Sequence, residues 1–144
     1  MPSCYLLAVA GGSSVDQHSN NVTLFSLVEQ IGVPPGAPPP PGGVILLELH
    51  AYFALDPAEQ GQSFELRFAM VAASGLETYS EVSTHRVITP RYRTRSVGLP
   101  FPPVMGAYEL RVDVRSVGSA SWQRASTAWP VVIGEYTPEP RVTH

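Results

Sequence analysis

The feature that most constrains the fold is the alternation of apolar and polar residues in GAYELRVDVRSVG, residues 106–118. Successive side chains of a strand point to opposite faces, so a period of two indicates a β-strand with one face in a core. The residues expected on the buried face are Tyr108, Leu110, Val112 and Val114, and those expected on the solvated face are Glu109, Arg111, Asp113 and Arg115. The segment predicts a half-buried antiparallel strand.

Two other segments repeat this alternation, residues 61–71 and residues 44–55. The buried face of the first is expected to hold Phe64, Leu66, Phe68 and Met70, and that of the second Leu47, Leu49, Ala51 and Phe53. The opposite face of the second is expected to hold Glu48, His50 and Tyr52. Further strand candidates, each bounded by turn-forming residues, are 4–10, 22–31, 78–88, 92–99 and 122–133.

One of these candidates, residues 22–31, also has a helical spacing of apolar residues, namely Leu24, Leu27, Val28 and Ile31. Its β-branched and aromatic content, with Phe25 on the wrong face of such a helix, favours a strand. Residues 56–62 allow one short helical turn.

About eight short strands separated by turn signals predict an all-β fold, with two antiparallel sheets packed face to face and little or no helix. An Ig-like β-sandwich is the simplest such arrangement, although the Cys…Trp…Cys spacing of antibody domains is missing. The length of 144 residues suits one domain. We expect a single domain over residues 1–134 and a C-terminal tail over residues 135–144.

The proline-rich stretch VPPGAPPPPGG, residues 33–43, lies between two predicted strands. Prolines stiffen a connection and reduce the entropy lost when it is ordered, which favours a crossover between the sheets. The spacing of Pro35 and Pro38 also fits a P-x-x-P ligand, but no basic residue lies nearby to orient such a motif. If the stretch is a proline-rich ligand rather than a crossover, the candidate partner-binding residues are Pro38, Pro39 and Pro40.

Charge and composition exclude several classes of partner. A formal net charge of -3 gives no bulk reason to expect nucleic acid or an anionic membrane surface. No window approaches the length of a membrane span, and the apolar run after Cys4 is short and lacks the basic segment of a secretion signal. A single cysteine cannot form an intramolecular disulfide. We expect a cytoplasmic protein.

Signatures of catalysis and cofactor binding are weak. The four histidines, His18, His50, His85 and His144, have no spacing that supplies two metal ligands from one element. No nucleophile elbow or phosphate-binding loop appears, and GGSS at 11–14 is interpreted as a flexible turn. We expect no enzyme and no cofactor. A hydrolase would require a histidine within hydrogen-bond reach of Ser, Cys or a carboxylate in a pocket.

The sequence RYRTR places Arg91, Arg93 and Arg95 on one face of a predicted strand. Three neighbouring guanidinium groups repel one another unless anionic groups lie close by. Either acidic side chains on an adjacent strand or an external partner should balance these charges. We favour a solvated face that also protects an edge strand over an acidic protein partner or nucleic acid.

Trp122 and Trp129 are separated by an odd number of residues, so a regular strand would send them to opposite faces. One is expected in the core, and the other is a candidate for stacking on a sugar or a protein surface. Pro130 suggests that this segment lies at a sheet edge.

Several short motifs occur together: an apolar first strand, a polar turn with Asp16, the segment SNNVTLFSLVEQI, the proline-rich stretch and, late in the chain, LPFPPVMGAYELRV. In this order the sequence resembles a family of small bacterial β-sandwich proteins whose function is not established. The resemblance implies a β-sandwich in a bacterial cytoplasm and assigns no functional residues.

These features favour a non-catalytic protein that acts through contacts with a protein partner or with other copies of itself. The candidate contact residues are Arg91, Arg93, Arg95, Trp122, Trp129 and the prolines 38–40. A small-ligand or carbohydrate-binding module that uses a tryptophan is the alternative.

Overall fold

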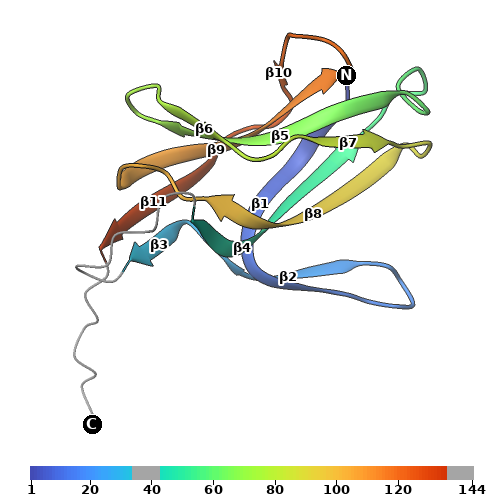
Figure 1. The fold of residues 1–144 in the computed structure, drawn as a ribbon. Helices are drawn as coiled ribbons and strands as arrows, with labels where there is room; N and C mark the ends of the chain where they lie inside the picture. Colours follow the sequence, from blue (N-terminus) through green and yellow to red (C-terminus); the bar gives the residue numbers. More distant parts are fainter. Residues whose placement is uncertain (34–42, 136–144) are drawn as a thin grey trace.

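A computed structural model describes residues 1–33 and 43–135, which form two β-sheets packed face to face (Figure 1). Prolines 38–40 and residues 136–144 of the predicted tail (135–144) lie outside the described residues, and Glu135 is the last residue of a strand. The strands are β1 (Ser3–Val15), β2 (Val22–Leu27), β3 (Gln30–Val33), β4 (Val44–Ala54), β5 (Ser63–Ala72), β6 (Glu77–Tyr79), β7 (Ser83–Arg86), β8 (Arg91–Pro100), β9 (Gly106–Ser116), β10 (Gln123–Arg124) and β11 (Trp129–Glu135).

The first sheet has four strands in the order β2-β1-β4-β8, and the second has seven. In the second sheet the order is β3-β11-β9-β5-β6, with β10 added on β9 and β7 added on β5. The described residues contain no helix, and the segment 56–62 forms only a turn. The prediction of an all-β fold with two packed sheets is confirmed.

The described strands outnumber the predicted ones because three predicted segments each break into two strands. Residues 22–31 are extended rather than helical, but β2 pairs with β1 in the first sheet and β3 pairs with β11 in the second. Ser26 has a positive φ of 52°, which is rare for a residue with a side chain and precedes the change of sheet. The β3–β11 pair is parallel, so the prediction of purely antiparallel sheets was wrong.

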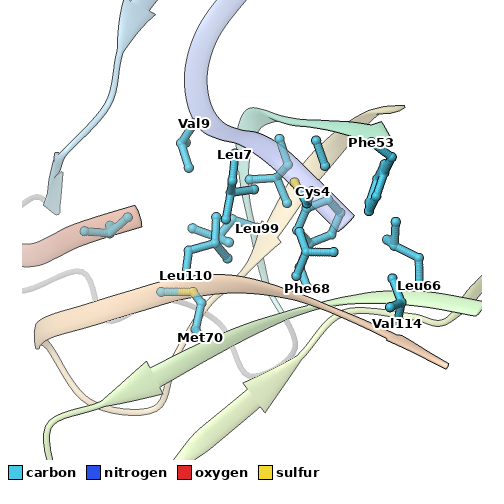
Figure 2. Close-up of a cluster of buried hydrophobic side chains, with 14 of the residues drawn as sticks. Cys4, Leu7, Val9, Phe53, Leu66, Phe68, Met70, Leu99, Leu110 and Val114 are labelled. Carbon is cyan, nitrogen blue, oxygen red and sulfur yellow. The ribbon is translucent and has the colours of Figure 1, made fainter. Parts of the chain in front are cut away.

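The core lies between the sheets and is built from the alternating faces predicted for β4, β5 and β9 (Figure 2). The side chains of Phe53, Phe64, Leu66, Leu110 and Val112 are at most 2% exposed. Burying each such side chain contributes about 1.5–3 kcal/mol, so these alternating segments supply much of the stability.

Not all residues predicted on the solvated faces are exposed. Asp113 is 2% exposed because Arg67 and Arg111 of the seven-stranded sheet reach its two carboxylate oxygens. Glu48 and His50 on β4 are 6% and 2% exposed, which shows that something covers the outer face of the four-stranded sheet.

The covering element is the hairpin of β1 and β2. The first half of β1 pairs with β4 up to Ala10, and the second half pairs with β2 alone. Figure 1 shows this hairpin curving past β4 and β8 on the side away from the seven-stranded sheet. The segment GGSS at 11–14 is therefore part of a strand, and the turn lies at residues 16–21, where the Asp16 carboxylate accepts hydrogen bonds from two backbone N–H groups.

Candidate binding surface on the four-stranded sheet

Arg91, Arg93 and Arg95 lie on one face of β8, as their alternation predicts. They are in register with Ala54, Tyr52 and His50 of β4. Thr94, between two of them, is buried and donates a hydrogen bond to the Ala51 carbonyl at 3.1 Å.

Glu48, on the strand next to β8, is the acidic neighbour expected for this cluster. Its carboxylate pairs with the Nε of Arg95 and also accepts a hydrogen bond from Ser13 Oγ at 3.2 Å. His50 Nε2 lies 3.4 Å from its other oxygen. Burial alone would raise the pKa of Glu48, but the hydrogen bonds from Arg95, Ser13 and His50 outweigh burial and lower the pKa below its ordinary value.

Arg93 is held by the tip of the β1–β2 hairpin. One of its terminal nitrogens donates a hydrogen bond to the Asn20 carbonyl at 2.8 Å, and its guanidinium lies 5.9 Å from the centre of the Tyr52 ring. Because Ser13 also contacts Glu48, the hairpin is fastened to the sheet at two separate places.

Arg91 differs from both because its guanidinium lies 5.2 Å from the ring of the exposed Tyr5 and has no hydrogen-bond or carboxylate partner in the described part of the chain. The Tyr5 and Tyr52 rings meet edge to face with centroids 6.2 Å apart. We call Tyr5, Tyr52, Arg91 and Arg93 the Arg–Tyr patch.

A β-bulge places Tyr5 in this patch. The pairing of β1 with β4 shifts by one residue between Cys4 and Leu6, so Tyr5 is the extra residue of the bulge. Bulges redirect side chains, and here the bulge leaves Tyr5 56% exposed beside Tyr52. Sequence reasoning missed Tyr5 because a bulge breaks the alternation on which that reasoning depends.

A comparison with the other arginines shows how unusual Arg91 is. Among the described residues, the arginines paired with carboxylates are Arg67, Arg95, Arg111 and Arg115. Those bonded to backbone carbonyls instead are Arg86, Arg93 and Arg124. Within the described ranges, Arg91 has neither kind of acceptor.

Trp122 lies on the seven-stranded sheet, away from this patch. Its ring lies 4.2 Å from the guanidinium of Arg67 and 4.3 Å from that of Arg115. Arg67 also lies 3.7 Å from the ring of Tyr79. The indole is therefore already engaged by two cations of its own chain.

Trp129 is the tryptophan that lies on the core side, the environment expected for one of the two. It packs against the core and donates a hydrogen bond from Nε1 to the Val28 carbonyl at 2.8 Å. β11 as a whole lies between β9 and β3, so it is not an edge strand along its full length. Its pairing with β3 begins only at Val132, so within the described residues one side of the strand is open at Pro130, as the proline predicts.

His85 forms a second polar cluster that sequence reasoning did not find. Its Nε2 lies 2.7 Å from Ser83 Oγ, its Nδ1 lies 2.8 Å from the Tyr92 hydroxyl, and its ring stacks on Phe64. Burial lowers the pKa of His85 and raises that of Tyr92, so both groups are held neutral near pH 7. The contact joins β7 of one sheet to β8 of the other.

This cluster supplies the serine–histidine contact that a hydrolase would need. The third group is a phenol rather than the carboxylate that orients the histidine of a catalytic triad. The interaction also holds the two sheets together where β7 and β8 meet.

The described residues contain no group of three His, Cys, Asp or Glu residues placed to hold a metal ion. No helix in residues 1–33 and 43–135 is long and apolar enough to cross a membrane. Comparison of the sequence with protein-family models and with curated proteins finds no match.

Proposed function

We propose that this protein is a non-catalytic β-sandwich module that binds an acidic segment of a protein partner through the Arg–Tyr patch. The observation that carries the proposal is Arg91, an exposed guanidinium with no carboxylate or carbonyl acceptor among the described residues. An acidic partner would supply the anionic groups that the sequence led us to expect beside this arginine cluster.

The composition of the patch supports a protein partner. Tyr and Arg are enriched among the residues that dominate binding energy at protein interfaces. A guanidinium over a tyrosine ring gains about 0.5–1 kcal/mol at an exposed site, and this contact leaves its N–H groups at the edge available to a carboxylate. Arg91 and Arg93 are therefore oriented before a partner arrives, which reduces the entropy cost of binding.

The fold provides a rigid support for such a surface. We infer that the sandwich is Ig-like, because the chain crosses repeatedly between two packed sheets and Tyr108 at the start of β9 donates a hydrogen bond from its hydroxyl to the Val104 carbonyl. This contact resembles the tyrosine corner of Ig-like domains, which fixes the crossover into the second sheet.

A fluorescence anisotropy titration with a fluorescein-labelled peptide of ten glutamates tests the proposal. We expect saturable binding that weakens with added salt and falls about tenfold in Arg91→Gln, because one charge-assisted hydrogen bond is lost. Arg124→Gln is the matched control, since it removes the same charge from β10 on the other sheet. Equal losses in the two variants would show that only net charge matters and would refute a specific patch.

The carbohydrate-binding alternative gains less support. A sugar platform needs an accessible aromatic face, and the Trp122 ring is engaged by Arg67 and Arg115. Trp129 packs against the core. The two tryptophans therefore do not form a common surface in the described structure.

A further inference from the structure

A cavity of about 120 Å³ lies between the β1–β2 hairpin and the outer face of the four-stranded sheet. Val15 and Val22 of the hairpin line one side of it. The sheet contributes His50, Tyr52, Arg93 and Arg95. A single water molecule requires only about 10–15 Å³ of such volume, so the cavity has room for a larger polar group.

Much of the lining of this cavity is apolar, and its free hydrogen-bond donors come from Arg93, Arg95 and Tyr52. Arg95 uses its Nε for Glu48, which leaves its two terminal nitrogens without a partner in the described structure. Arg93 uses one terminal nitrogen for the Asn20 carbonyl and keeps the other. The Tyr52 hydroxyl makes no hydrogen bond within the described residues.

The charge balance around the cavity is positive. Arg93 and Arg95 carry two positive charges, and among the described residues only the carboxylate of Glu48 pairs with either of them. Glu48 does not line the cavity, and its carboxylate is engaged by Ser13, His50 and Arg95.

We propose that this cavity binds one small oxyanion, of the chemistry shared by phosphate and carboxylate groups. The planar fork of a guanidinium matches two oxygens of such an anion, and the Tyr52 hydroxyl at the same cavity adds a further donor. Arg93 and Tyr52 are half-buried, which strengthens their hydrogen bonds relative to bulk water. The site shares Arg93 and Tyr52 with the Arg–Tyr patch and differs from it in using Arg95 rather than Arg91 and Tyr5.

The bound anion would join the hairpin to the sheet. Arg93 already contacts the hairpin tip and Arg95 contacts Glu48, so an oxyanion between them would link both attachment points. A ligand that binds only the folded state raises the unfolding temperature as its concentration increases. We therefore expect phosphate to stabilise the protein beyond the effect of ionic strength alone.

Isothermal titration calorimetry with inorganic phosphate, acetate and phenyl phosphate, each in chloride buffer of constant ionic strength, tests the proposal. The strongest signal with inorganic phosphate would identify a free phosphate ion as the ligand type. The strongest signal with phenyl phosphate would indicate a phosphorylated side chain, and with acetate a carboxylate. Absence of saturable binding of all three at millimolar concentrations would overturn the proposal.

Variants assign any binding to the cavity. We expect Arg95→Gln to weaken binding about tenfold or more. This change also removes the partner of Glu48, so it can alter the fold as well as the cavity. A second variant, Tyr52→Phe, removes only a hydroxyl and keeps the ring in place. We expect it to weaken binding severalfold. Binding that survives both changes would overturn the proposal.

Arg91→Gln separates this site from the proposed protein-binding patch. Arg91 does not line the cavity, so its variant should keep full affinity for the small anion and lose affinity for the acidic peptide. Arg95→Gln should lose the small anion whether or not the acidic peptide binds. The affinities of these two variants for the small anion and for the acidic peptide therefore test the two proposals independently.

Discussion

Glu48 pairs with Arg95 across β4 and β8 beneath the β1–β2 hairpin, and the two residues together connect three strands through Ser13. A buried carboxylate with three hydrogen-bond partners has a fixed position, so the pair fastens the hairpin to the outer face of the sheet. This attachment also defines one side of the cavity between the hairpin and the sheet.

Acid should weaken this attachment. The pKa of Glu48 is below its ordinary value of 4.5 in the folded protein, so the ionised carboxylate stabilises the fold. Its contribution is fully present above about pH 4.5 and is lost as the pH falls through the lower folded value. We expect urea unfolding of Glu48→Gln between pH 7 and pH 3 to show a shallower loss of stability than wild type.

Glu109→Gln provides the control for this pH profile. Glu109 is exposed on β9, and its variant should follow the wild-type profile. Parallel profiles for wild type and Glu48→Gln would contradict the assigned role of the carboxylate.

The hydrogen bond between His85 and Tyr92 should stabilise the contact between the sheets. Tyr92→Phe removes the hydroxyl and leaves His85 Nδ1 unpaired, which should lower the free energy of unfolding by about 1 kcal/mol. Urea unfolding at pH 7 measures this change. Tyr52→Phe, which removes a hydroxyl with no partner in the described structure, should leave stability nearly unchanged, and equal effects of the two variants would refute the bridge.

Ser83 should be chemically inert despite its contact with His85. We expect no covalent labelling by a fluorophosphonate probe, because His85 is oriented by the phenol of Tyr92 rather than by a carboxylate. Mass spectrometry of the intact protein measures the labelling. Stoichiometric modification of Ser83 that disappears in His85→Gln would establish a nucleophile and contradict a non-catalytic function.

The alternation of side chains predicted the core because burial depends mainly on which face of a strand a residue occupies. Leu49, Phe64 and Leu110 are buried as their positions indicated. The same reasoning placed Glu48, His50 and Asp113 in solvent, since it treats each sheet as having one bare face. A folded-back hairpin and cross-strand arginines cover those residues, and both depend on long-range pairing that a local pattern does not contain.

The candidate site was predicted only in part for a related reason. The arginine face on β8 follows from sequence spacing, but the tyrosines beside it come from β4 and from a bulge in β1. Tyr5 and Arg91 are far apart in the sequence, so only the strand order brings them together. The split of residues 22–31 between two sheets likewise depends on β11, which lies a hundred residues further on.

The measurement that tests the central claim most directly is a ¹H–¹⁵N NMR titration of the labelled protein with the glutamate peptide. We predict saturable shift changes confined to the patch strands, centred on the backbone amides of Tyr5, Tyr52, Arg91 and Arg93. We predict little change around Trp122 and Arg67 on the other sheet. Shift changes centred on Trp122, or no saturable change anywhere, would contradict the binding of an acidic partner by the Arg–Tyr patch.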